Sequence, residues 1–285
     1  MLSLLPLLFS AGAEFRVDTL AFRFTRPTAM VFSGGSLYVA EEDGKIWVAR
    51  NDTTRLVIKG LKPPVNGLAL AGETLFVSHR GKVSAFFKGT LTDVVAGLPS
   101  QGACSNNGLL VGPGGRLYLG QGEEDCFSSS HALSGTVLRF RKDGSGLEVF
   151  SKGFHDPWGL AFQGDTLWVT DPGCYPPDYY QTLDGVYRVD PKGEWISVHL
   201  GPGDYPRGLC FWNDTLYVAC FGDPFLRKED TRPRLVKVFR KKGDYQVKDV
   251  PLDLGRPVDV KPGPDGALYV LDGEGGRVFR ITRKK

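Results

Sequence analysis

Residues that could carry out chemistry crowd together in the stretch LPSQGACSNNGLLVGPGGRLYLGQG, residues 98–122. Cys104 and Asn107 precede a short apolar run there, and a Gly-Pro-Gly-Gly turn follows that run. A thiol has an ordinary pKa of about 8.5, so it is a poor base at neutral pH unless a cation lowers that pKa. Amide oxygens are ligands that calcium accepts. Apolar runs joined by such a turn predict a β-hairpin, with these polar residues at its start.

The hairpin within residues 98–122 is one of six similar copies along the chain. In order, the copies read RPTAMVFSGGSLYVAEEDGKIWVAR, VNGLALAGETLFVSHRGKVSAFF, NNGLLVGPGGRLYLGQG, DPWGLAFQGDTLWVTDPG, YPRGLCFWNDTLYVACFGD and RPVDVKPGPDGALYVLDGEGGRVFRIT. Each copy has a Pro or Asn at its start, a short apolar strand, a tight turn and a second strand that alternates Leu, aromatic and aliphatic residues. A third and a fourth strand follow, for example GTVLRF and LEVFSKGF. Four strands at a period of roughly 40 to 50 residues predict the blade of a β-propeller.

The two ends of the chain complete this pattern together. The sixth copy ends at RVFRITRKK with only three strands, and the segment EFRVDTLAF, residues 14–22, supplies a fourth. Such a closure removes the open edge of the last blade. We therefore predict an all-β fold, a six-bladed β-propeller with four strands per blade, whose last blade is closed by the N-terminal strand.

The first residues have the pattern of an export signal. Residues 1–13, MLSLLPLLFSAGA, contain a short apolar run followed by Ala-Gly-Ala, the small-x-small form of a signal-peptidase site. The run is too short to span a membrane. The segment has no basic residue at its start, so a mis-assigned start or a frayed tail is the alternative. We predict a signal peptide over 1–13, the propeller over 14–285, and export to the periplasm or the cell exterior.

The charge and the cysteine spacing limit the kinds of partner and metal that we expect. The 285 residues carry a net charge of +3, and the basic residues are scattered, which argues against a nucleic-acid partner. Five cysteines occur without a CxxC or Cys/His spacing, which argues against a zinc site. We expect a monomer or a small homo-oligomer that takes a small molecule, such as a sugar or a lactone, and has no membrane span.

The chemistry-bearing side chains gather at one end of the predicted ring. The starts of the first strands and the ends of the second strands meet there, and ligands of propellers commonly bind where such loops converge. The starts supply Asn66, Asn107, His155, Asp156, Arg207 and Arg256, and the ends supply Glu41, His79, Glu123, Asp171, Asp223 and Asp272. Loop ends are also polar because they are solvated, so the convergence predicts a site more strongly than any single residue does.

The order of the six copies and their loop lengths resemble the soluble sugar dehydrogenases that depend on pyrroloquinoline quinone (PQQ), the glucose and sorbosone dehydrogenase-like six-bladed propellers. GFHDPWGLAFQGDTLWVTDPG is similar to the family's Gly-x-Arg-Asn-Pro-x-Gly-Leu-Ala-Phe blade. GRPVDVKPGPDGALYVLDGEGGRVFRIT is similar to its last blade, and AGLPSQGACSNNGLLVGPGGRLYLGQG aligns with its third. The resemblance covers essentially the whole segment 14–285.

The resemblance implies hydride removal from the C1 hydroxyl carbon of a sugar to PQQ, with a histidine as general base and Ca²⁺ polarising the quinone. The family's catalytic histidine falls on Cys104 in this sequence. Its Arg-Asn pair falls on His155 and Asp156, and its calcium-holding Gln-Gly-Pro falls on 172–174. The quinone-binding lysine falls near Gly222. In the last blade one arginine is kept, as Arg256, and a second is replaced by Val258.

These correspondences define the predicted site residues, with PQQ and calcium as the implied cofactors. We assign catalysis to Cys104 and His155; cofactor binding to Asp156, Arg207 and Arg256; and metal binding to Asn66, Asn107, Asp156 and Asp171.

Two other functions are open at this point. A calcium-dependent lactonase-type hydrolase would use hard oxygen ligands from separate blades, such as Asn66, Asn107, Asp156 and Glu41. The same Asn-Gly pairs also serve simply to turn the chain into a strand. The third alternative is a propeller that binds a sugar or a protein partner without catalysis, because a fold can be kept after its catalytic activity is lost. Aromatic residues of the predicted rim could stack on such a sugar or simply pack the loops: Trp158, Tyr175, Tyr179, Tyr180, Tyr205 and Phe225.

The state of Cys104 also has two alternatives. Export permits a disulfide, and Cys126 and Cys174 lie on the nearest predicted loops. The alternatives are a Cys104–Cys126 bridge, a Cys104–Cys174 bridge and a free thiol. Cys210 falls within a strand, where a small core residue is expected.

Overall fold

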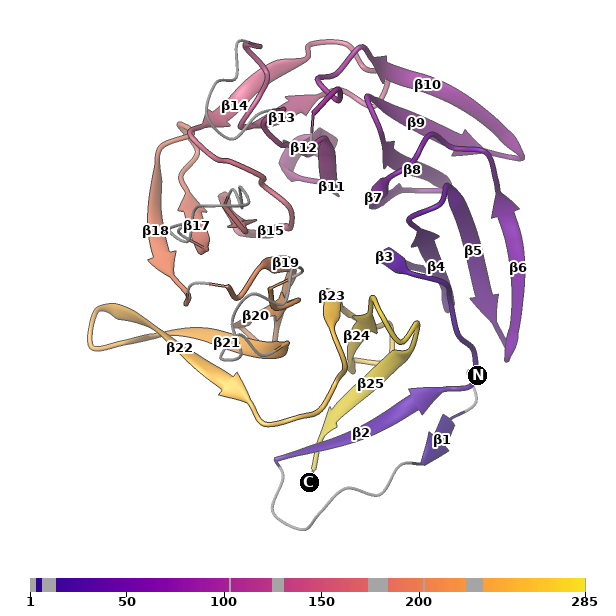
Figure 1. Ribbon diagram of the computed structural model, residues 1–285, viewed down its shortest axis with the longest axis vertical. Coiled ribbons are helices and arrows are strands. Elements are labelled where there is room, and N and C mark those ends of the chain that lie inside the picture. The colour runs from indigo at the N-terminus through magenta and orange to yellow at the C-terminus, as the bar shows by residue number, and fades with distance from the viewer. Residues whose placement is uncertain are drawn as a thin grey trace.

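Six antiparallel sheets surround one axis like the blades of a propeller (Figure 1). The structure is a computed structural model that describes residues 4–6, 14–102, 104–124, 131–173, 184–201, 203–223 and 233–284. A single 3-10 turn, Pro113–Gly115, is the only helical element among these residues. The part of the chain that is described has no helix long and apolar enough to cross a membrane.

The strands follow the chain around the ring. Blade one contains β3 (Pro27–Ser33), β4 (Ser36–Glu41), β5 (Lys45–Arg50) and β6 (Thr53–Ile58), and blade two contains β7 (Val65–Ala71), β8 (Thr74–His79), β9 (Lys82–Phe87) and β10 (Thr90–Ala96). Blade three contains β11 (Asn106–Val111), β12 (Leu117–Gln121), β13 (Thr136–Phe140) and β14 (Glu148–Lys152), and blade four contains β15 (Leu160–Gln163), β16 (Thr166–Asp171), β17 (Gly185–Val189) and β18 (Trp195–His199). Blade five contains β19 (Pro206–Trp212), β20 (Thr215–Cys220), β21 (Arg234–Lys241) and β22 (Asp244–Val250). Blade six contains β23 (Pro257–Pro262), β24 (Leu268–Asp272), β25 (Val278–Arg283), β2 (Phe15–Leu20) and β1 (Leu4–Pro6).

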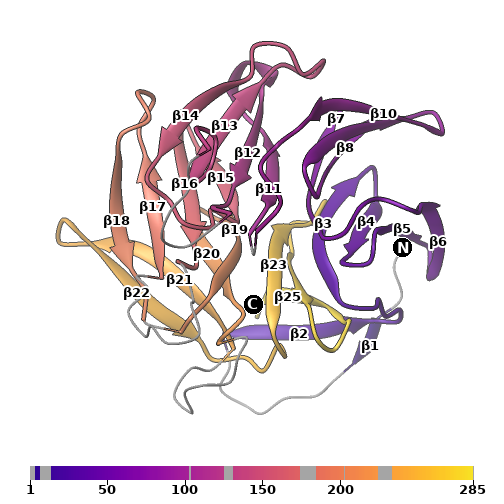
Figure 2. The same cartoon turned by 45° about the horizontal axis from the view of Figure 1, so that its top comes forward.

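The N-terminal strand closes the last blade, as the sequence predicts. Strand β2 lies beside β25 (Figure 2), antiparallel, from the Phe15–Arg283 pair to the Thr19–Phe279 pair. Phe15 and Leu20 are buried, so each contributes about 1.5–3 kcal/mol of hydrophobic free energy to this closure. Leu4–Pro6 adds β1 outside β2. That segment lies within the predicted signal peptide, which stays a prediction.

The second strand of each blade is buried between neighbouring sheets. In blade three every residue of β12 is buried. Leu117 and Leu119 of that strand share a hydrophobic cluster with Phe76 and Val83 of blade two. The continuous apolar run predicted for these strands is therefore explained by burial on both faces. The core is divided into six such clusters around the ring.

Glycines close the centre of the ring. A Cβ added at Gly67 would lie 2.5 Å from the carbonyl oxygen of Asn107, and one added at Gly108 would overlap the carbonyl oxygen of Trp158. A Cβ added at Gly159 would likewise overlap the carbonyl oxygen of Arg207, and one added at Gly208 would overlap Asp259 Oδ1. The cavity that remains has a volume of about 30 Å³, which is room for about one water molecule. A sugar is therefore too large for the channel itself, and a ligand of the channel residues must bind at the channel end.

Bulges at the start of the innermost strands turn side chains toward that end. The pairing register shifts near the start of β3, β7, β11, β19 and β23. Asn66, Asn107 and Arg207 each precede a central glycine at such a shift. A bulge re-aims the side chain that it carries. The repeated bulge thus explains why similar positions of several blades contribute to one site.

Candidate functional site

The candidate site lies at one end of the ring, which we call the channel mouth. It is defined by five side chains from successive blades: Asn66, Asn107, Asp156, Arg207 and Arg256. Asn66 comes from blade two and Asn107 from blade three. Asp156 precedes β15, Arg207 is in β19, and Arg256 precedes β23. All five were predicted from the sequence.

Three of these side chains form a buried line across the blades. Asn66 Nδ2 donates to Asn107 Oδ1 at 3.0 Å, and Asn107 Nδ2 donates to Asp156 Oδ1 at 2.6 Å. Each of the three is at most 5% exposed. Buried polar groups that bond to one another fix each other's orientation. The carboxylate of Asp156 is therefore held in one position at the mouth.

The pKa of Asp156 is raised to about 7, chiefly because the carboxyl group is buried. The hydrogen bond from Asn107 and the charge of Arg207 lower the pKa, and the nearby Asp171 carboxylate raises it. Both carboxylate oxygens of Asp171 are already hydrogen-bonded, because they accept the backbone N–H groups of His155 and Asp156, each at 2.8 Å. An acid that titrates near neutral pH can both take up and release a proton in a catalytic cycle. Asp156 therefore has the acidity that a general base at the mouth requires.

Cys104 lies beside Asp156 and is a free thiol. Burial, and then the negative charges of Asp156 and Asp171, raise the pKa of Cys104 above its ordinary value. No cation offsets these effects among the causes that act on it. The thiol therefore stays protonated at neutral pH and is a poor base or nucleophile. Both predicted disulfide partners, Cys126 and Cys174, lie outside the described residues.

His155 stands at the outer edge of the mouth. Its Nδ1 lies 3.0 Å from Glu123 Oε2, and its side chain is half exposed. Glu123 also donates its backbone N–H to the carbonyl oxygen of His155 at 2.7 Å. The pair is well placed to bind hydroxyl groups, since it offers both donors and acceptors.

Arg207 is set among aromatic rings. Its guanidinium carbon lies 4.2 Å from the ring centroid of Trp158, 4.4 Å from that of Phe221 and 5.1 Å from that of Tyr205. Burial lowers the pKa of Arg207, and Tyr205 and Asp156 act in the opposite direction. Its Nε is buried and has no hydrogen-bond partner among the described residues. The Nε–H of Arg207 therefore lacks a hydrogen-bond acceptor among the described residues.

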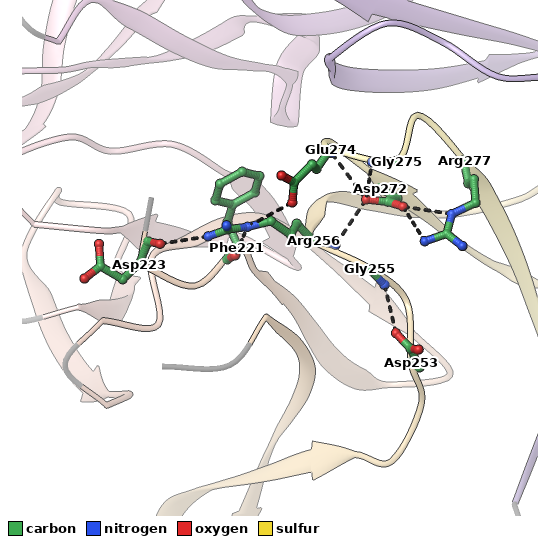
Figure 3. Close-up of polar contacts among 9 residues, drawn as sticks. All are labelled: Phe221, Asp223, Asp253, Gly255, Arg256, Asp272, Glu274, Gly275 and Arg277. Atoms are coloured by element: carbon green, nitrogen blue, oxygen red, sulfur yellow. Dashed lines mark hydrogen bonds and ion pairs between the residues drawn. The ribbon is translucent and has the colours of Figure 1, made fainter. Parts of the chain in front are cut away.

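Arg256 approaches the same phenyl ring (Figure 3). Its guanidinium carbon is also 4.4 Å from the ring centroid of Phe221. Its Nε donates to the carbonyl oxygen of Phe221 at 3.2 Å, and its Nη2 donates to that of Asp223 at 2.8 Å. The one carboxylate that pairs with it among the described residues, Glu274, is 3.9 Å away and largely exposed. Two arginines thus share Phe221 and make this side of the mouth positive.

Several other residues predicted at this end support the fold. Glu41 accepts the backbone N–H of Thr25 at 2.5 Å and the indole N–H of Trp47 at 2.7 Å. Asp272 accepts the backbone N–H of Arg256 at 3.1 Å and pairs with Arg277, which shapes the turn that carries Arg256 (Figure 3). These acidic side chains are therefore committed to loop structure.

Three of the four predicted calcium ligands already accept hydrogen bonds within the protein. Asn107 and Asp156 each already accept a side-chain hydrogen bond through one oxygen, and both oxygens of Asp171 accept backbone N–H groups. Across the described ranges, no group of three or more His, Cys, Asp and Glu side chains is close enough to hold a metal ion. Calcium takes about six to eight oxygen ligands, and metal binding by Asn66, Asn107, Asp156 and Asp171 stays a prediction.

Sequence reasoning missed Phe221 and the internal bonding of the mouth. Phe221 directly follows β20, and its position at the end of a second strand was the available signal. The Asn66–Asn107–Asp156 line was missed because the same residue types also suit a metal. The predicted aromatic residues Tyr175, Tyr179, Tyr180 and Phe225 lie outside the described residues.

Comparison with known proteins shows the fold. No protein-family model matches the chain, and no curated protein matches it. A solved structure from Thermus thermophilus, assigned as an oxidoreductase of the glucose dehydrogenase type, is 23% identical with a TM-score of 0.78 and covers 94% of this chain and 100% of its own. The PQQ-bound aldose sugar dehydrogenase of Streptomyces coelicolor is 19% identical with a TM-score of 0.73, and covers 96% and 100%. A gluconolactonase from Xanthomonas campestris is 16% identical with a TM-score of 0.70, and covers 95% and 90%. This chain therefore has the six-bladed propeller fold of the soluble sugar dehydrogenases.

Proposed function

We propose that this protein oxidises a sugar at the channel mouth, with PQQ as the electron acceptor and Asp156 as the general base. Export to the periplasm or the cell exterior is part of the proposal. The observation that carries it is a buried carboxyl group with a pKa near 7 at the same mouth as two arginines. The Nε of Arg207 has no hydrogen-bond partner among the described residues, and the carboxylate that pairs with Arg256 is 3.9 Å away. Similar structures that include a PQQ-bound sugar dehydrogenase support this choice of chemistry.

The positive side of the mouth fits the quinone. PQQ is a planar aromatic acid that carries carboxylates. Arg207, with its unpartnered Nε, and Arg256 would bind those carboxylates. Trp158 and Phe221 would line the planar ring system, because aromatic faces favour such contacts. When bound, the quinone supplies an acceptor for the hydride of the sugar C1–H.

The acidic side of the mouth would handle the proton. The ionised carboxylate of Asp156 accepts the proton of the C1 hydroxyl group, while Asn107 keeps that carboxylate oriented and Asn66 orients Asn107 in turn. His155 and Glu123 would hold other sugar hydroxyls at the rim. The Cys104 thiol takes no part, because it stays protonated. No step is assigned to calcium.

Reduction of a dye by PQQ-loaded protein, over a panel of aldoses, tests the proposal. Asp156→Asn keeps the size and one oxygen of the side chain but removes the base, so kcat/KM should fall about 10²–10⁴-fold. Cys104→Ala is the matched control at the same place and should keep its rate within about threefold. Full activity in Asp156→Asn would refute Asp156 as the base.

Lactone hydrolysis is the second candidate. It needs no oxidant, Asp156 could deprotonate water as it would a hydroxyl group, and one similar structure is a gluconolactonase. Acid release from a sugar lactone, followed in a pH-stat without quinone, separates the two reactions. A protein that catalyses neither reaction would be the ligand-binding propeller that the sequence leaves open.

A further inference from the structure

A basic residue faces an aromatic residue across the second and third strands of four blades. The cross-strand pairs are Tyr118–Arg139, Trp168–Arg188, Tyr217–Lys237 and Tyr269–Arg280. Three of the four basic residues have a carboxylate partner: Arg139 pairs with Glu148 at 2.8 Å, Lys237 with Glu14 at 3.7 Å, and Arg280 with Asp265 at 2.7 Å. In three of the four blades, therefore, a carboxylate lies beside the basic residue that faces the aromatic ring.

Blade four lacks that anion. In blade three the residue that faces Arg139 on the outer strand is Glu148, whereas in blade four the residue that faces Arg188 on β18 is Ile196. Arg188 forms no ion pair with any residue that the structure describes. Ile196 is 52% exposed, so burial of an apolar side chain does not account for the substitution. The position of the missing carboxylate is open to solvent.

A groove lies at this position between blades four and five, which are neighbours in the ring (Figure 1). One part of it has a volume of about 290 Å³ and is lined by Trp168, Arg188, Phe211, Arg240 and Tyr245, among others. A second part of about 430 Å³ shares Arg188, Arg240 and Tyr245 and includes Ile196. The groove is large enough for a monosaccharide-sized ligand.

The lining of the groove combines cations with aromatic rings. Arg188 and Arg240 are exposed, and neither forms an ion pair among the described residues. Asp214 and Asp244 also line the groove, and they form no ion pair with either arginine. Trp168 is 3% exposed, and its Nε1–H is buried without a hydrogen-bond partner within the described ranges. A buried donor that lacks a partner indicates a missing acceptor.

We propose that this groove binds a small carboxylated ring compound of the sugar-acid type. Its carboxylate takes the place that Glu148 has in blade three and accepts from Arg188 and Arg240. Its C–H face packs on the aromatic wall of Phe211 and Tyr245, next to the buried indole of Trp168. The groove includes residues at the β15–β16 and β19–β20 turns, the strand ends opposite the channel mouth. The inference is therefore independent of the proposed function.

Titration with glucuronate, followed by NMR of the ¹⁵N-labelled tryptophan indoles, tests the inference in the full chain. The Trp168 indole signal should shift saturably with glucuronate, and glucose and acetate should each bind at least about tenfold more weakly because each lacks one half of the recognised group. Glucose that binds as tightly as glucuronate would overturn the role of the carboxylate.

The matched variants are Arg188→Gln in blade four and Arg139→Gln in blade three. Both residues are cross-strand partners of an aromatic residue, so Arg139→Gln controls for the loss of that pairing and also loses the bond to Glu148. Arg188→Gln should weaken glucuronate binding at least about tenfold, and Arg139→Gln should leave it within about twofold. Arg188→Lys, which keeps the charge but not the two-pronged geometry, should lie between. Equal affinity in all variants, or no saturable shift of Trp168, would overturn the site.

Discussion

Replacement of Asp156 by Asn should stabilise the protein at alkaline pH while it removes the proposed base. Asp156 is fully buried, and its pKa is about 7 in the folded protein against 3.8 ordinarily. Folding therefore favours the protonated acid, and the contribution is fully present below pH 3.8. It is lost as the pH rises toward 7, above which the buried charge costs the folded state most. In the variant, Asn107 still finds an oxygen acceptor in the new side-chain amide.

The size of the effect follows from the two pKa values. Their difference corresponds to about 4 kcal/mol at 1.36 kcal/mol for each unit of pKa, which is an upper limit. The neutral amide accepts a weaker hydrogen bond from Asn107 than a carboxylate does, and this returns about 1 kcal/mol. We therefore expect Asp156→Asn to raise the free energy of unfolding at pH 8 by about 2–3 kcal/mol, or the Tm by about 5 °C.

Urea unfolding of wild type and variant at pH 8 and pH 4 measures the effect. The difference between them should nearly vanish at pH 4, where the wild-type carboxyl group is protonated. Asp165→Asn, at an exposed turn of blade four, is the control and should change stability by less than about 0.5 kcal/mol. A variant that is less stable than wild type at pH 8, or a difference that does not depend on pH, would refute the reasoning.

Four further predictions follow from the same structure. Phe15→Ala should lower the free energy of unfolding by about 3–5 kcal/mol, because the buried Phe15 packs β2 of the last blade against Trp212. Urea denaturation measures this loss, and a loss below about 1 kcal/mol would contradict closure of the last blade by β2. Gly108→Ala should cost about 3 kcal/mol in the same assay, since the new methyl group overlaps the carbonyl of Trp158; an unchanged midpoint would show that the ring centre is looser than described. Cys104 should react with iodoacetamide at pH 8 at least about tenfold more slowly than in the unfolded chain, because the pKa of its thiol is raised. Mass spectrometry measures the alkylation, and a fast reaction of the native protein would contradict this prediction. The kcat/KM of sugar oxidation should rise with pH and level off above about 7, as Asp156 must be ionised to act, and a profile that falls through pH 7 would exclude it as the base.

The fold was predictable from the sequence because each blade repeats the same strand pattern. The six copies of the first hairpin indicate the number of blades, and the missing last strand identifies residues 14–22 as its replacement, which the pairing of β2 with β25 confirms. The regular spacing of the hairpins could not reveal the register shifts, which depend on how adjacent blades pack. It is these shifts that aim Asn66, Asn107 and Arg207 at the mouth.

The site was predictable as a set of residues but not as a set of bonds. Asn66, Asn107 and Asp156 have the residue types of a calcium site, and only the structure shows that they hydrogen-bond to one another. The pKa of Asp156 could not be predicted either, since it depends on burial and on Asp171. Phe221 was not predicted as a site residue, because no sequence motif marks a single aromatic residue after a strand. Only the structure shows that Arg207 and Arg256 both contact its ring.

The central claim is that the two arginines at Phe221 bind PQQ, and calorimetric titration of the protein with the quinone tests it most directly. The account predicts saturable binding that persists in EDTA, since it assigns the quinone contacts to the arginines and no step to calcium. It also predicts affinity at least about tenfold lower in Arg207→Gln, because a charge-assisted contact is lost. Absence of saturable binding, or equal affinity in the variant, would contradict it.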